Sequence, residues 1–151
     1  LFLIGVKEIL IIIKYKYMET CIICKIVEGE LPSYKVYEDK DVLAFLDINP
    51  VKDGHTLVIP KKHYPNLEEI PEKDLQKVIV AVKKIGQSLK NGLGVDSYNV
   101  CKNNDPAAGQ IIPHIHFHLI PRYEGDELKS WPQAPYLEGK AEETLEKIKL
   151  N

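Results

Sequence analysis

Three histidines alternate with apolar residues in one short stretch, and this alternation limits the fold more than any other feature of the sequence. They are His114, His116 and His118, three of the five histidines in the chain. Successive side chains of a β-strand point to opposite faces, so residues 113–121 are predicted to form a strand with all three histidines on one face. A helix would scatter them, and the β-branched and aromatic residues between them also favour a strand.

This histidine face indicates chemistry rather than packing. A single buried histidine usually has a structural role, because buried polar groups are commonly satisfied by hydrogen bonds. Three histidines on one face add no apolar burial to a core, whereas imidazole can act as a nucleophile, a general acid or base, or a metal ligand near neutral pH. The pattern alone leaves these roles open for each histidine.

The rest of the chain predicts an antiparallel α+β domain. Apolar residues recur at helical spacing from Glu72 to Leu89, with Pro71 near the start of this long helix and Asn91-Gly92 as its stop. Strands are expected at residues 34–38, 42–46, 55–60 and 97–101, a short helix at residues 21–29, and a further helix at residues 138–150. Together with the histidine strand, this order of elements favours α+β architecture over a doubly wound sheet.

Length and charge limit the size of the fold and its partners. With 151 residues, the chain is long enough for one domain with a sizeable core. Its formal net charge is −2, and its lysines are interleaved with acidic residues. We therefore expect no nucleic-acid partner held by net charge.

Residues 1–17 differ in composition from the rest. Lys7 and Glu8 interrupt their apolar runs, so no run approaches the roughly 20 residues of a membrane span, and no signal-peptide cleavage site follows. The only methionine is Met18, so we expect residues 1–17 to be an upstream extension and residues 18–151 to form the domain. The alternative is a short amphipathic segment that packs on the domain or on a membrane surface. We expect no membrane partner.

A Cys-x-x-Cys pair, Cys21 and Cys24, stands at the start of this domain, and Cys101 is the third cysteine. An odd number of cysteines does not suit a disulfide framework, so a reducing, cytoplasmic setting is expected. The pair is half of a zinc site, a redox pair or two ordinary cysteines, and no strand precedes it, as a thioredoxin-like site would require. Zinc needs four ligands, and His63 and His114 are available. We predict a structural zinc ion held by Cys21, Cys24, His63 and His114.

These motifs together resemble the histidine triad (HIT) superfamily, and specifically its Hint-like nucleotide-hydrolase branch with a zinc site. The resemblance rests on HIHFHLI after Gly109-Gln110, CIICKI near the start, AFLDI at residues 44–48 and GHTLVIPK at residues 54–61. It implies a five-stranded antiparallel sheet with one long and one short helix, in a homodimer whose two sheets join. It also implies cleavage or transfer of a nucleotide from nucleoside 5′-phosphoramidate-like or dinucleotide substrates, through a covalent nucleotidyl-histidine.

The resemblance also implies a role for each matching residue. His116 would attack the α-phosphorus, while His118 and His55 would contact the phosphate and the leaving group. Gln110 and the backbone N–H groups of residues 109–111 would face the phosphate oxygens, and Asp47 would hold both ribose hydroxyls. The other nucleotide-binding residues would be Asn103, Gly109 and His118, with an apolar slot for a purine base, expected to be adenine, formed by Ile23, Ile26, Phe45 and Ile48.

One position differs from the family pattern, since Ile111 stands where many members have a serine or threonine. A nucleotide-binding regulatory module with little turnover is therefore an alternative function. A hydrolase with all three triad histidines on a catalytic zinc is another. Two cysteines and two histidines would fill a tetrahedron and leave no position for water, which counts against the zinc hydrolase.

Overall fold

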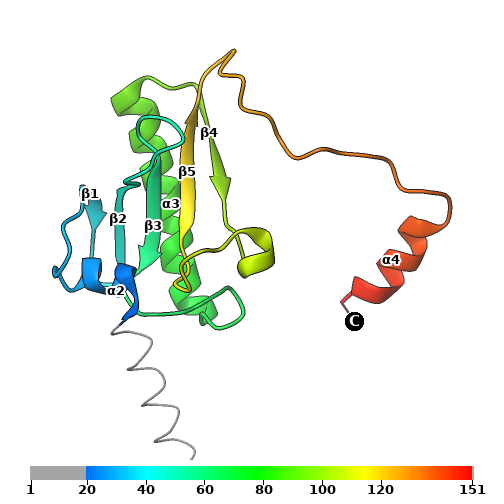
Figure 1. The fold of residues 1–151 in the computed structure, drawn as a ribbon, viewed down its shortest axis with the longest axis horizontal. Helices are drawn as coiled ribbons and strands as arrows, with labels where there is room; N and C mark the ends of the chain where they lie inside the picture. Colours follow the sequence, from blue (N-terminus) through cyan, green and yellow to red (C-terminus); the bar gives the residue numbers. More distant parts are fainter. Residues whose placement is uncertain (1–19, 151) are drawn as a thin grey trace, which may run out of the picture.

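The computed structural model describes residues 20–150. Five strands form one antiparallel sheet, and a long helix lies on one face of it (Figure 1). The spatial order of the strands is β1-β2-β3-β5-β4, and every neighbouring pair is antiparallel. The predicted α+β class and five-stranded sheet are thus confirmed, whereas the predictions for residues 1–17 lie outside the described part. The strands are β1 (Lys35–Glu38), β2 (Val42–Leu46), β3 (Thr56–Pro60), β4 (Ser97–Cys101) and β5 (Phe117–Arg122).

The long helix α3 (Glu72–Leu93) runs one turn further than predicted. Gly92 remains inside the helix, because a glycine there costs only about 1 kcal/mol and does not by itself end a helix. Gly94 ends it instead, with φ of +66° and its N–H donated to the carbonyl oxygen of Lys90. Glycine adopts this left-handed conformation without steric cost, so the stop was wrongly placed by two residues.

The histidine strand differs from the prediction at both ends. β5 begins only at Phe117, and it continues through Pro121 to Arg122. β3 pairs with β5 only as far as Leu119, and β4 alone continues the pairing beyond it. The missing N–H of Pro121 therefore costs no hydrogen bond to β3. His114 and His116 precede the strand, which corrects the prediction that residues 113–121 form it.

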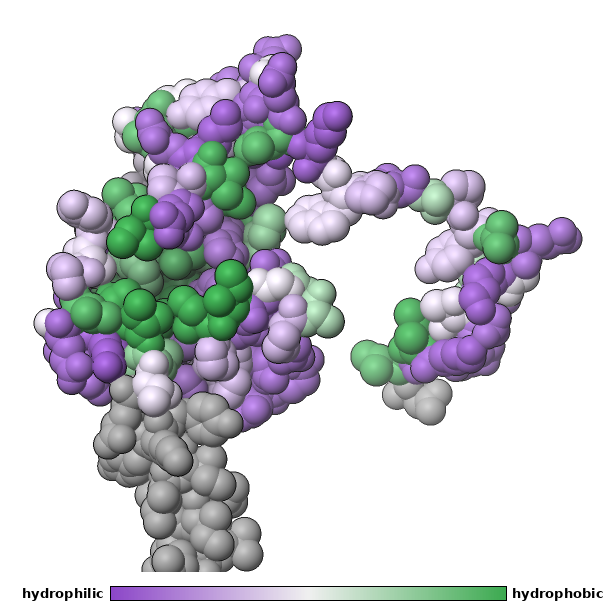
Figure 2. All heavy atoms as spheres, in the orientation of Figure 1, coloured by the Kyte–Doolittle hydropathy of each residue, from purple (hydrophilic) through white to green (hydrophobic). Residues whose placement is uncertain are grey.

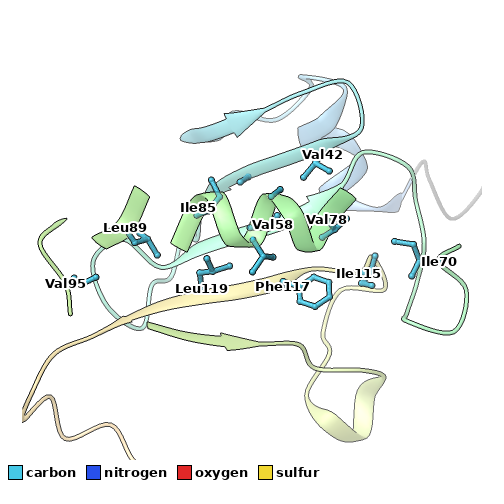
Figure 3. Close-up of a cluster of buried hydrophobic side chains, with 13 residues drawn as sticks. Val42, Val58, Ile70, Val78, Ile85, Leu89, Val95, Ile115, Phe117 and Leu119 are labelled. Atoms are coloured by element: carbon cyan, nitrogen blue, oxygen red, sulfur yellow. The ribbon is translucent and has the colours of Figure 1, made fainter. Parts of the chain in front are cut away.

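Side chains nevertheless alternate along this segment as predicted. Ile115, Phe117 and Leu119 all enter the main core between the sheet and α3 (Figure 3). Of the apolar residues at helical spacing in α3, Val78, Val82, Ile85 and Leu89 are buried in this core and Leu75 packs against it, as the periodicity predicted. Ala81 also enters the core, whereas Ile79 is exposed.

A second apolar cluster lies on the opposite face of the sheet, beneath the short helix α2 (Ile22–Val27). β2 sends Val42 and Ala44 into the main core, and Leu43 and Phe45 into this second cluster. Because both faces are covered here, β2 is apolar at every position instead of alternating. α2 is thereby held against the sheet, which fixes the cysteines at its N-terminus.

The C-terminal helix α4 (Lys140–Ile148) stands apart from the sheet at the end of an extended segment (Figure 1). None of its residues is buried. It confirms the helix expected at residues 138–150, with closer bounds. Within residues 20–150, no helix combines the length and the apolar character that a membrane crossing requires.

Candidate active site and metal centre

Four potential metal ligands meet beside α2. Cys21 and Cys24 lie at its N-terminus, His63 follows β3, and His114 precedes β5. Cys24 Sγ lies 3.3 Å from Nδ1 of His63 and 3.6 Å from Nδ1 of His114, and Cys21 Sγ lies 3.6 Å from Nδ1 of His114. All four side chains are buried. The structure thus brings together the four ligands predicted from the sequence.

The spacing of these atoms suits tetrahedral zinc. Typical Zn–S and Zn–N bonds place sulfur and nitrogen ligands about 3.5 Å apart along a tetrahedral edge, close to the observed separations. His114 donates its Nε2 proton to the carbonyl oxygen of Pro60 at 2.9 Å, which leaves the lone pair of Nδ1 directed at the thiols. Burial and the neighbouring Cys21 raise the pKa of the Cys24 thiol to about 12. A bound zinc ion would reverse that effect, because it holds the thiolate.

A second polar group lies next to this one and contains Asp47, His55, His116 and His118. His55 Nε2 lies 2.9 Å from His118 Nδ1, and His55 Nδ1 lies 3.7 Å from a carboxylate oxygen of Asp47. The rings of His116 and His118 have their centroids 5.0 Å apart. The triad is therefore divided, because His114 lies with the cysteines while His116 and His118 do not. This division counts against a zinc hydrolase that uses all three.

Backbone groups determine where the protons of these neutral imidazoles lie. The N–H of Val51 donates to Nδ1 of His55, so Nε2 of His55 carries the proton that is donated to Nδ1 of His118. His118 must then carry its own proton on Nε2. The carbonyl oxygen of His114 accepts the Nδ1 proton of His116 at 2.6 Å, which leaves a lone pair on Nε2 of His116.

Burial favours the neutral form of each imidazole. It lowers the pKa of His118 to about 4, and the neighbouring His116 and His55 act in the same direction. It also lowers the pKa of His55 and of His116, partly opposed by the nearby charge of Asp47. All three rings are therefore uncharged at neutral pH, as a nucleophilic imidazole must be.

The loop between β4 and β5 brings together Asn103, Gly109 and Gln110. Gly109 has φ of +89°, and a Cβ added there would lie 3.4 Å from Nδ2 of Asn103, so the Asn103 amide packs against the glycine. The side chain of Gln110 is buried, and its Nε2 donates to the carbonyl oxygens of Pro65 and Ile112. Both hydrogen bonds commit the Gln110 amide group to the loop.

Three of the four residues predicted to form the base slot pack together. Ile23 and Phe45 are buried in the second apolar cluster, and Ile26 packs against it. Ile48, in contrast, is 89% exposed in the turn after β2. Figure 2 shows a hydrophobic surface over α2 and the adjoining strands. Asp47 directs one carboxylate oxygen at His55 and accepts the N–H of Asn49 with the other.

Sequence analysis did not single out Lys102, which directly follows β4. Its Nζ donates to Oε1 of Gln110 at 3.1 Å and to Oδ1 of Asn104 at 2.9 Å. Lysine is common in polar loops, so its type and position gave little signal. Its only distinguishing feature was its place directly before Asn103.

The fold and the site define a small α+β protein with a histidine cluster next to a Cys₂His₂ group that could hold a metal ion. A model of the HIT domain matches residues 28–125, and the chain therefore belongs to the HIT domain family. A HIT-like protein of Methanocaldococcus jannaschii is 58% identical over 106 residues, 70% of this chain and 81% of that protein. Adenosine 5′-monophosphoramidase HNT1 of Saccharomyces cerevisiae is 41% identical over 114 residues, 74% of this chain and 70% of that protein.

Solved structures show the same fold. A HIT family protein from Bacillus subtilis superposes with a TM-score of 0.78 and 40% identity, over 85% of this chain and 94% of that chain. A Zn-bound histidine triad family protein from Mycobacterium smegmatis gives a TM-score of 0.71 and 34% identity, over 87% of this chain and 99% of that chain.

Proposed function

We propose that this protein is a nucleotide hydrolase, or nucleotidyl transferase, that cleaves adenosine 5′-phosphoramidate-like or dinucleotide substrates through a covalent nucleotidyl-histidine. The tautomer of His116 carries the proposal. Its Nδ1 proton is held by the carbonyl oxygen of His114, so the lone pair that can attack phosphorus is on Nε2. The phosphoramidase name of the yeast relative supports a phosphoramidate of adenosine.

The proposed reaction has two displacements at the α-phosphorus. Nε2 of His116 forms a bond to phosphorus as the bond to the leaving amine breaks, and the amine takes up one proton from solvent. The resulting nucleotidyl-imidazolium keeps its Nδ1 proton on the carbonyl oxygen of His114. Water then attacks phosphorus, the P–N bond to His116 breaks, and one proton returns to solvent. The Nε2 proton of His118 stabilises the phosphate or the leaving group by hydrogen bonding.

The surrounding residues would bind the rest of the nucleotide. Among residues 20–150, no acceptor binds the N–H of Ile111, which supports its use for a phosphate oxygen. The Asp47 carboxylate would accept hydrogen bonds from the two ribose hydroxyls. The base would lie beside the apolar cluster that contains Ile23, Ile26 and Phe45, with exposed Ile48 closing over it. Asn103, packed on Gly109, would contact the sugar and phosphate.

We also propose a structural zinc ion on Cys21, Cys24, His63 and His114. The spacing of their ligand atoms supports it, and so does the zinc in the Mycobacterium smegmatis relative. When bound, the ion would tie α2 to the two segments that carry the histidines. A homodimer with joined sheets is proposed on the resemblance and on the position of β4, which ends the sheet. The cytoplasmic location and the domain boundary at Met18 stay predictions.

Incubation with adenosine 5′-phosphoramidate tests the proposed function. We expect release of AMP and, after a rapid alkaline quench, an adenylyl adduct on the peptide that contains His116. Binding of the nucleotide with neither AMP release nor adduct would instead indicate the regulatory module, which the exposed Ile111 favours by lacking a hydroxyl.

The pH dependence of kcat/KM checks the neutral state of the imidazoles. A free imidazole gains a proton near pH 6.5, but burial lowers the pKa of His118 to about 4. Because burial also lowers the pKa of His116 and of His55, and because protonation of any of the three rings would disturb the site, we expect the acidic limb of kcat/KM to lie below pH 6.5. Samples held in acid and assayed again at neutral pH control for loss of metal. An acidic limb near pH 6.5 would contradict this result.

A further inference from the structure

We propose that Lys102 is a positioning residue for the hydrolysis, and that it acts through Gln110 on the backbone that orients His116. The proposal rests on the proposed function above. It follows from one continuous set of hydrogen bonds that joins the ammonium group of Lys102 to the ring of His116.

Four hydrogen bonds make this connection. Lys102 Nζ donates to Oε1 of Gln110 at 3.1 Å, and Nε2 of Gln110 donates to the carbonyl oxygen of Ile112 at 2.9 Å. The same carbonyl oxygen accepts the N–H of His114 at 2.8 Å. The carbonyl oxygen of His114 then accepts the Nδ1 proton of His116 at 2.6 Å. A displaced Gln110 amide would therefore disturb the backbone group that fixes the nucleophile's tautomer.

Lys102 binds this loop at three points. Besides Gln110, its Nζ donates to the carbonyl oxygen of Asn103 at 2.7 Å and to Oδ1 of Asn104 at 2.9 Å. Oδ1 of Asn104 also accepts the N–H of Leu67, so the segment after His63 is joined to the same network. One cation thereby connects the segments before α3, after β4 and before β5.

The loop needs such support because part of it is strained. Asp105 has φ of +66° and ψ of 164°, a region that residues other than glycine rarely adopt. Its carboxylate accepts hydrogen bonds from Asn66 and Asn104, and its N–H donates to Oε1 of Gln110. Strain of this kind persists only where surrounding contacts hold it. Lys102 Nζ and the N–H of Asp105 both donate to Oε1 of Gln110. Loss of the lysine therefore weakens the hold on the Gln110 amide that stabilises the strained Asp105.

Charge and burial are consistent with a fixed position for Lys102. Its side chain is half-buried, and burial lowers its pKa, opposed by the charges of Asp105 and Glu68. Lysines are seldom buried unless they are paired. Here the ammonium hydrogens go to three oxygens of the loop, so the lysine acts as a clamp and leaves phosphate contact to other groups.

Steady-state kinetics of Lys102→Met test the inference. Methionine keeps an unbranched apolar side chain but removes the charge and all three hydrogen bonds. We expect kcat to fall about 10- to 100-fold, as for other residues that orient a functional group through hydrogen bonds without touching the substrate. The Kd for AMP should change less than about twofold. Lys102→Arg should recover most of the rate, since a guanidinium can donate to the same oxygens. Equal kcat in wild type and Lys102→Met would overturn the proposal.

Lys77→Met is the matched control. Lys77 is also half-buried and is bonded to Asp41 and Asp74, but it lies on α3 outside this network. It should lower the Tm and leave kcat unchanged. If both lysine variants lose kcat in proportion to their loss of Tm, the effect of Lys102 is general destabilisation and the inference fails.

A double-mutant cycle with Gln110→Leu tests the route of the effect. If Lys102 acts through Gln110, the double variant should have the kcat of the slower single variant. If the losses of kcat in the two single variants multiply in the double variant, Lys102 acts by another route and the proposal is overturned.

Hydrogen exchange of the unliganded protein separates this inference from the proposed function. The N–H groups of Ala108 and Gln110 both donate to the carbonyl oxygen of Asp105, and we expect them to exchange faster in Lys102→Met than in wild type. A wild type without turnover would refute the proposed function and with it the positioning role, whatever the exchange shows. Turnover in the wild type with unchanged exchange in Lys102→Met would refute the clamp alone.

Discussion

His116→Ala is expected to abolish both turnover and the covalent adenylyl adduct. The proposed mechanism has a single nucleophilic lone pair, on Nε2 of His116, so the loss should reach at least about 10⁴-fold in kcat. Fold, zinc content and AMP affinity should largely survive, because the apolar side chains on either side of His116 remain in the core. Quench-flow with labelled adenosine 5′-phosphoramidate and mass mapping of the adduct measure both effects.

His118→Ala provides the comparison for this experiment. A group that only stabilises developing charge typically contributes about 100- to 1,000-fold to the rate, so this variant should still form the adduct, but more slowly. An adduct located on His118 or His55, or undiminished turnover without His116, would show that the roles are assigned wrongly.

Cys24→Ser should lower zinc content and stability together. Cys24 contacts both histidines of the proposed metal centre, and serine is a poor ligand for zinc. The proposed ion joins α2 to segments before and after α3, so its loss should cost more than the roughly 0.5–3 kcal/mol of an ordinary substitution, because loss of a metal is one of the few mechanisms with larger effects. Zinc quantified by mass spectrometry and the Tm of the same sample give the two measurements.

Cys101→Ser is the matched control, because Cys101 lies on β4 and is not among the four ligands. It should keep its zinc and lose little stability. A Cys24→Ser protein that lacks zinc but unfolds at the wild-type temperature would contradict the structural role of the metal.

Periodicity predicted most of the fold correctly, because each element buries a face of its own. The spacing of Val78, Val82 and Ile85 identified α3, and the alternation after His114 identified two faces of one segment. The errors occurred at element ends. Pro121 continues β5, since the neighbouring strand β3 no longer pairs there, and only knowledge of the sheet order reveals this.

The candidate metal centre was predictable for a different reason. Two cysteines and two histidines that lie close together usually bind a metal ion, so residue type alone limited the choice of ligands. The loop network was not predictable. Pro65, Lys102 and Gln110 are polar or irregular loop positions with no period, and their hydrogen bonds join segments distant in sequence.

The neutral imidazoles have a consequence for how the site responds to salt. Burial keeps His55, His116 and His118 uncharged near pH 7, so the site would hold the proposed anionic substrate mainly by oriented N–H dipoles at hydrogen-bond distance. Mobile ions screen charges over a Debye length of about 8 Å at physiological ionic strength, but they do not enter a hydrogen bond of about 3 Å. If the site binds the phosphate as proposed, we therefore expect the orientation of that phosphate to depend little on ionic strength.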